Sequence, residues 1–163
     1  MIVEQYDDCS PDNLAFVGAQ PHEVRVAGYL DGPCVWPAKG WSMFPGRPKV
    51  RLTTTANDLA DAYDWEKGTA PLSAVKAQVL FRSKAYLPSA VYCDQSHWES
   101  AYARLEGLPI VWWVAAWGAA DWPVLKVGGK TIRAAAWQYA SLPDYDVSHV
   151  DAVAWPVLGE PAP

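Results

Sequence analysis

The sequence predicts one α/β domain built on a mainly parallel sheet. Two observations predict it. The middle of the chain alternates short runs rich in β-branched and aromatic residues with runs of helical periodicity. The run Pro109–Ala116 is almost wholly apolar, as expected of a strand covered on both faces. At 163 residues, of which 51% are apolar, the chain has the length of one domain and enough apolar material to bury a core.

The elements are predicted in chain order as follows. Residues 1–20 are rich in Asp, Pro and Asn, so we expect an irregular N-terminal arm. The domain then spans residues 21–154, with an ordered aromatic loop over residues 33–47 and a Pro-rich, extended tail over residues 155–163. Strands are predicted from β-branched and aromatic content at Val24–Leu30, Lys49–Thr55, Asp61–Glu66, Ala90–Asp94, Pro109–Ala116, Thr131–Tyr139 and Tyr145–His149.

Two helices are predicted between these strands. Pro71 stands where the first begins, because its missing N–H costs nothing there, and apolar residues at helical spacing continue to about Tyr86. The second begins with a capping box, in which Ser96 and Glu99 satisfy each other's free backbone N–H groups, and ends before Gly107. We expect the following apolar side chains to be largely buried: Leu80, Val91, Val111, Trp113 and Val114.

Charge and cysteine content exclude several classes of function. The net charge is −5 and no basic cluster is present, which argues against a nucleic-acid partner. Cys9, Cys34 and Cys93 lie far apart without metal-like spacing. We therefore expect free, mostly buried thiols, although the sequence also allows one disulfide. No phosphate loop or dinucleotide motif occurs, so we expect no metal and no cofactor. The N-terminus lacks a signal-peptide pattern, and no apolar run approaches the roughly 20 residues that span a bilayer. We expect a soluble protein with no membrane partner.

Four acidic residues lie at the carboxyl ends of predicted strands, where the loops of parallel barrels build active sites: Asp31, Asp64, Glu66 and Asp146. Asp64 and Glu66 are two residues apart, so on a strand both carboxylates would face one cavity, roughly 6 to 7 Å apart. Glycosidases use such a pair, one acid to protonate the leaving oxygen and one carboxylate to stabilise positive charge on the sugar. For an isolated D-x-E motif, the alternative to a catalytic pair is that the two carboxylates are simply solvated at the end of a strand.

The order of motifs resembles the strand series of the family 25 glycoside hydrolases, the peptidoglycan muramidases, and their short actinobacterial and phage relatives. The resemblance spans about residues 24–152 and rests on Gly28–Asp31, Asp64–Gly68, Ala90–Asp94, Trp112–Ala115, Trp137–Tyr139 and Tyr145–His149. It implies a TIM-barrel-like fold, a compact or incomplete (β/α) barrel with mainly parallel strands. A full barrel usually needs ~200 or more residues, so units are missing or loops replace helices.

In that family a first-strand acid, the D-x-E pair and a final-strand acid surround the cleavage site. The resemblance therefore implies that the catalytic residues are Asp31, Asp64, Glu66 and Asp146. Glu66 would be the proton donor, and Asp64 would position the N-acetyl group or stabilise charge. The candidates for substrate binding are Trp65, Trp112, Gln138 and Tyr139, although packing is the alternative for each aromatic residue.

Two functions are compatible with these features. The first is a glycosidase that hydrolyses peptidoglycan glycan strands and is encoded by a phage. The second is a catalytically inactive relative that serves as a glycan-binding or structural module of a phage virion. The expected partner is peptidoglycan or another cell-surface glycan, joined in the second case by other virion proteins. The lack of a signal pattern fits both, because the protein would stay in the host cytoplasm until lysis or be part of the virion, and act at the cell wall.

Overall fold

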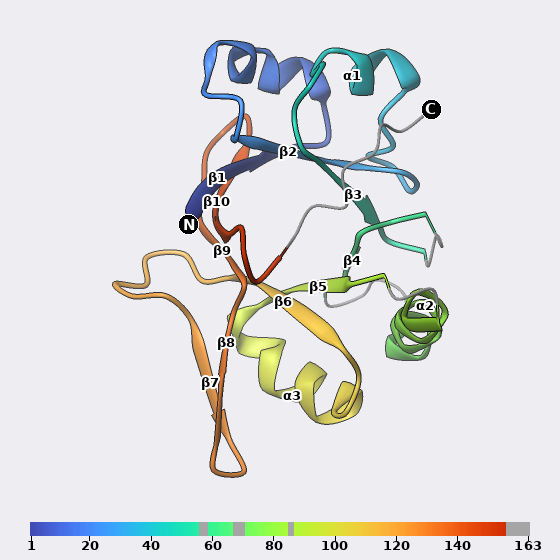
Figure 1. Ribbon diagram of the computed structural model, residues 1–163, viewed down its shortest axis with the longest axis vertical. Coiled ribbons are helices and arrows are strands. Elements are labelled where there is room, and N and C mark those ends of the chain that lie inside the picture. Colours follow the sequence, from blue (N-terminus) through green and yellow to red (C-terminus); the bar gives the residue numbers. More distant parts are fainter. Residues whose placement is uncertain (56–58, 67–70, 85–86, 156–163) are drawn as a thin grey trace.

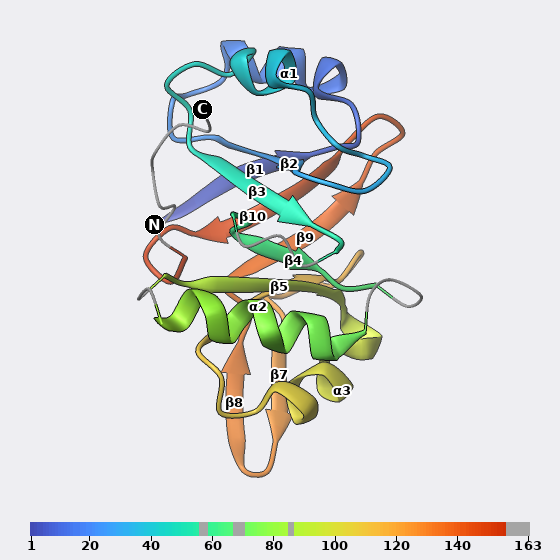
Figure 2. The same cartoon turned by 90° about the vertical axis from the view of Figure 1, so that its right-hand side faces the viewer.

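The computed structural model describes residues 1–163 except 56–58, 67–70, 85–86 and 156–163. Its centre is a closed barrel in which the strand order is β1-β10-β9-β6-β5-β4-β3-β2 (Figures 1 and 2). The barrel strands are β1 (Ile2–Asp7), β2 (Arg25–Tyr29), β3 (Lys49–Thr53), β4 (Ala62–Asp64), β5 (Ser89–Asp94), β6 (Ile110–Ala115), β9 (Ala136–Ser141) and β10 (Asp146–Asp151).

The direction of the strands decides where a site can form. Every neighbouring pair from β1 through β6 to β9 is parallel, and β10 alone is antiparallel to both of its neighbours. The carboxyl ends of the parallel strands therefore share one mouth, and β10 begins at that mouth. A separate hairpin of β7 (Val124–Val127) and β8 (Lys130–Arg133) stands out from the barrel between β6 and β9 (Figure 2).

Helices cover only parts of the barrel. α2 (Leu72–Lys84) and α3 (Gln95–Leu105) pack beside β5 and β6. The short helix α1 (Ala38–Ser42) and the 3₁₀ helix η1 (Pro11–Ala19) lie together on the side of β1 and β2 (Figure 1). The barrel is thus compact because loops replace helices, while its strands form a closed ring.

The apolar side chains divide into an interior core and two outer cores. Trp113 fills the barrel with Val3, Leu52 and Val150 around it, and its indole N–H donates to the Ser148 hydroxyl over 3.0 Å. One outer core lies under α2 and α3, and the other lies under η1 and α1 around Trp36. Within the described ranges, no helix combines the length and apolar character that a transmembrane helix needs.

The N-terminal segment differs from the sequence prediction. We expected residues 1–20 to be an irregular arm, but β1 pairs with both β2 and β10 and closes the barrel. Its alternation places Val3 in the barrel interior and Tyr6 in the outer core under η1. The Asp- and Pro-rich residues that suggested an arm belong to η1 and its flanks. The expected strand Val24–Leu30 is therefore the second strand of the barrel.

Several local predictions also need correction. The expected strand Thr131–Tyr139 is two strands, because the buried Ala134 and Ala135 carry the chain from the hairpin into the barrel. Asp94, and not Ser96, caps α3 by accepting a hydrogen bond from the His97 N–H. Asp146 opens β10 instead of ending a strand.

The expected burial is confirmed for Val91, Trp113 and Val114, while Val111 is only half-buried. Leu80 is 40% exposed, so its predicted burial is wrong. It lies next to the buried Val79, on the side of α2 that turns away from β5. The expected helix end near Tyr86 lies outside the described residues.

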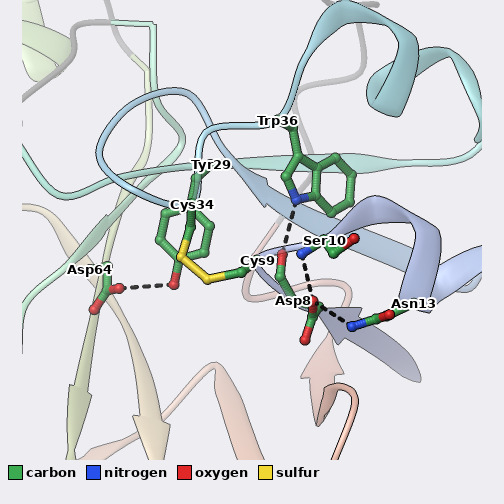
Figure 3. Close-up of a disulfide and its surroundings, with 8 residues drawn as sticks. All are labelled: Asp8, Cys9, Ser10, Asn13, Tyr29, Cys34, Trp36 and Asp64. Atoms are coloured by element: carbon green, nitrogen blue, oxygen red, sulfur yellow. Dashed lines mark hydrogen bonds between the residues drawn. A yellow bond between two sulfur atoms is a disulfide. The ribbon is translucent and has the colours of Figure 1, made fainter.

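The cysteines form one disulfide, between Cys9 and Cys34, and the expectation of free thiols holds only for the buried Cys93. β1 and β2 are neighbours in the barrel, so the loops that follow them meet. Figure 3 shows the disulfide bridging these loops beside the hydrogen bond from the Trp36 indole to the Asp8 carbonyl, 2.9 Å long.

Candidate active site at the barrel mouth

Inward-facing side chains form a polar ring at the barrel mouth. Strand residues alternate between the interior and the outside, so the last inward position of each strand points toward the mouth. Two hydrogen bonds tie this ring together: the Tyr29 hydroxyl donates to Asp64 over 2.9 Å (Figure 3), and the Tyr92 hydroxyl donates to the Gln138 carbonyl over 2.5 Å. The ring consists of Asp7, Tyr29, Asp64, Tyr92, Gln138 and Asp146.

Asp64 is the carboxyl group most suited to titrate near neutral pH. It ends β4 and is 7% exposed. Burial raises its pKa to about 7, the charge of Glu66 adds to the rise, and the hydrogen bond from Tyr29 opposes it. Its Oδ1 atom is buried and accepts no hydrogen bond from the described residues.

Asp7 and Asp146 form a second acidic pair. They stand directly opposite each other in the antiparallel β1–β10 register. Burial raises the pKa of Asp7 well above its ordinary value, and the nearby charges of Asp146, Asp64 and Asp8 raise it further. Burial also raises the pKa of Asp146, although hydrogen bonds with Ser141 and Gln138 oppose the rise. Two neighbouring carboxyl groups in such a setting do not both ionise readily, so they titrate as a pair.

Glu66 and Trp65 lie at the rim. Glu66 is exposed just past the end of β4. The Trp65 N–H donates to the Tyr92 carbonyl over 2.9 Å, which continues the pairing of β4 with β5. The Trp65 ring meets the His97 ring edge-on, with 6.0 Å between centroids. The D-x-E pair therefore has one buried acid and one solvent-exposed acid.

Asp31 is placed differently from the ring carboxyls. It accepts hydrogen bonds from the hydroxyls of Thr53 and Thr55 and from the backbone N–H of Thr54. Burial alone would raise the pKa of Asp31, but these hydrogen bonds outweigh it and hold the pKa below its ordinary value. Because β1 precedes the strand that the sequence suggested as the first, Asp7 occupies the first-strand position that the resemblance assigned to Asp31.

The substrate-binding candidates separate in the structure. Gln138 belongs to the mouth ring, and Trp65 lies at its rim. Trp112 is buried beneath α3 against Trp98 and Tyr102. Tyr139 points to the outside of the barrel, where it contacts Trp137 and His149.

Three ring residues were not predicted from the sequence: Asp7, Tyr29 and Tyr92. A signal for the first was present, because Ile2–Asp7 has the same pattern of β-branched and aromatic residues followed by Asp as Val24–Asp31. The two tyrosines had no sequence signal beyond their places near strand ends. Among the described residues, no group of three or more His, Cys, Asp or Glu is arranged to hold a metal ion.

The barrel is similar in fold to several solved structures. It is similar to the catalytic domain of the endolysin ply40 from bacteriophage P40 of Listeria monocytogenes, with a TM-score of 0.58 and 13% identity over 95% of this chain and 96% of that chain. It is also similar to a family GH25 lysozyme from Aspergillus fumigatus, with a TM-score of 0.56 and 13% identity over 92% and 94% of the two chains.

A third similar structure is GHIP, a glycosyl hydrolase 25 of Streptococcus pneumoniae described as a virulence factor that participates in host cell invasion. Its TM-score is 0.57, with 8% identity over 92% of this chain and 87% of that chain. The protein has a family 25 glycoside hydrolase fold. The likeness is distant in sequence: no family model matches the chain, and no curated protein matches it. The family 25 fold therefore rests on the barrel itself.

Proposed function

We propose that the protein is a muramidase-type glycosidase that hydrolyses the glycan strands of peptidoglycan. The observation that carries the proposal is the placement of two carboxyl groups at the mouth of a family 25-like barrel: Asp64 is buried and held by Tyr29, and Glu66 is exposed at the rim. Pairs of carboxyl groups in unlike surroundings are how glycosidases divide acid and charge-stabilising roles.

In this mechanism Glu66 is the proton donor. It lies at the rim, where the oxygen between two sugars is within reach, and its proton transfers to that oxygen as the glycosidic bond breaks. Asp64 lies deeper, held by Tyr29, and in its ionised form it stabilises positive charge on the sugar or positions the N-acetyl group. Asp146 and Gln138 complete the floor of the mouth, with Asp7 opposite Asp146. Trp65 offers an aromatic surface at the rim.

The proposal is tested with purified peptidoglycan by measuring the release of reducing sugar. Glu66→Gln keeps the shape of the side chain but cannot give up a proton, so the rate should fall by roughly 10² to 10⁴, the usual share of general acid catalysis. Glycan binding should be retained. Glu99→Gln is the matched control, because Glu99 is an exposed glutamate on α3.

The outcomes separate the two functions. Full hydrolysis by the Glu66→Gln variant would show that Glu66 is not the proton donor. If the wild-type protein binds peptidoglycan and releases no reducing sugar, the protein is instead a glycan-binding module, and a place in a phage virion becomes the better proposal.

A further inference from the structure

The outer face of β9, β10 and β1 carries a row of aromatic and polar side chains. In the strand register His149 is opposite Trp137 on one side and opposite Glu4 on the other. Because strand residues alternate in direction, these side chains point away from the polar ring of the mouth. We call this group the outer aromatic strip, and its members are Glu4, Trp122, Trp137, Tyr139 and His149.

Contacts within the strip hold its rings in fixed positions. The ring centroids of Tyr139 and His149 are 4.3 Å apart, those of Trp137 and Tyr139 are 5.8 Å apart, and those of Trp122 and Trp137 are 6.1 Å apart. Backbone carbonyls satisfy both indole N–H groups: Trp137 donates to Ala116 over 2.9 Å, and Trp122 donates to Ala134 over 2.5 Å. All five side chains are half-buried, so part of each stays in contact with solvent.

Helices cover only the edges of this face. Near the mouth η1 packs on Val147 of β10, with Tyr139 at the edge of that core, and Trp122 borders the core under α2 and α3. α2 and α3 lie beside β5 and β6, and η1 and α1 lie beside β1 and β2. In a (β/α) barrel this side would bury apolar side chains under helices. Here it combines aromatic rings with the Glu4 carboxylate and the His149 imidazole.

We propose that the outer aromatic strip is a second glycan-binding surface, separate from the mouth. A sugar ring has an apolar face that packs on aromatic rings, and hydroxyl groups around its edge that hydrogen-bond to a carboxylate and an imidazole. The strip supplies both kinds of partner in adjacent register positions. The acidic chain and the carboxylate in the strip disfavour a nucleic acid.

The position of the strip favours a glycan over a second copy of the chain. β9 and β10 present Gln138 and Asp146 to the mouth and the strip to the outside. Near the mouth end of β9, Tyr139 follows Gln138 in the chain, so the strip begins close to the rim of the mouth. One polymeric substrate can therefore contact both surfaces. The inference rests on the proposed function for the identity of the glycan.

The test compares a polymeric ligand with a short one. Insoluble purified peptidoglycan is incubated with full-length protein carrying Glu66→Gln, so that it is not digested, and the bound fraction is measured. Adding Trp137→Ala or His149→Ala should weaken binding by about tenfold. Without Glu66→Gln, the same strip variants should keep the wild-type kcat/KM on a soluble tetrasaccharide of the glycan strand, which is too short to reach both surfaces. Circular dichroism and thermal unfolding check that each variant folds.

Phe81→Ala is the matched control. Phe81 is a 53% exposed aromatic residue on α2. Figure 1 shows α2 on a different side of the barrel from β9 and β10. This variant should bind insoluble peptidoglycan as the parent does.

Three results would overturn the proposal. The first is unchanged peptidoglycan binding by both strip variants. The second is a loss of tetrasaccharide turnover equal to the loss of peptidoglycan binding. The third is a dimer in sedimentation that Trp137→Ala converts to a monomer. Failure of the proposed function gives a different result. If the wild-type protein hydrolyses no peptidoglycan but the strip variants still lose glycan binding, the glycosidase proposal is refuted and the second binding surface is supported.

Discussion

Replacing Asp64 by Asn should stabilise the fold above neutral pH while removing hydrolysis. Asp64 is buried at the end of β4, and its pKa of about 7 compares with an ordinary value of 3.8. The folded state therefore disfavours the ionised carboxylate. Asn has nearly the same shape and no charge, and its amide oxygen can accept the hydrogen bond that the Tyr29 hydroxyl donates to Asp64.

The size of the effect follows from the two pKa values. Between pH 3.8 and about 7 the folded state holds more protons at Asp64 than the unfolded state does, so the free energy of unfolding falls as pH rises through this window. Each pH unit is worth ~1.36 kcal/mol, so a window of about 3 units amounts to about 4 kcal/mol. Below pH 3.8 both states are neutral at this site and the contribution vanishes. The Asn variant loses none of this stability. The difference in free energy of unfolding between the variant and the wild type, which we call the gap, should therefore grow with pH and level off above about 7.

The measurement is urea unfolding of wild type and Asp64→Asn at a series of pH values from about 4 to about 8.5. At the upper end the gap corresponds to an increase in Tm of roughly 10 °C for a chain of this length. Asp12→Asn, at an exposed position on η1, is the control for the loss of a surface carboxylate. A gap that stays constant with pH, or a wild type that is the more stable protein at alkaline pH, would refute the reasoning.

Two further predictions concern the surroundings of the mouth. Tyr29→Phe removes the donor that opposes the rise in the pKa of Asp64. If hydrolysis needs Asp64 ionised, the acidic limb of the pH–rate profile should move up by about one to two pH units, and an unmoved limb would exclude this role. Reducing the Cys9–Cys34 disulfide, which joins residues separated by 25 positions, should lower the free energy of unfolding by about 3 kcal/mol. The Cys9→Ser/Cys34→Ser variant should show the same loss and no response to dithiothreitol, and Cys93→Ser should keep the response.

The sequence by itself determined most of the local elements. The apolar run of β6 and the helical spacing of α2 are local patterns. A strand buried on both faces needs a continuous apolar run, and a helix buried along one stripe needs apolar residues at helical spacing, so each pattern can be read from neighbouring residues. The strands that end in Asp64 and Asp94 were predicted for the same reason. The compact parallel barrel was predicted as well, from the alternation of elements together with the resemblance of the motif series.

Only the tertiary structure decided which side chains meet. Asp7 reaches the mouth because β1 pairs with β10, more than a hundred residues later in the chain, and no local pattern carries that pairing. The parallel pairing of β1 with β2 brings Cys9 to Cys34. Adjacent side chains of one apolar strand also point in opposite directions: Trp113 fills the barrel and Trp112 lies under α3.

The direction of a strand side chain depends on the register of its neighbours, because a shift of one residue exchanges inside and outside. The sequence offered Gln138 and Tyr139 alike as ligand candidates. The register of β9 turns Gln138 toward Tyr92 in the mouth and Tyr139 toward His149 on the outer face. Local propensity places a strand in the chain, but the closed ring of neighbouring strands selects the carboxylates that share a cavity.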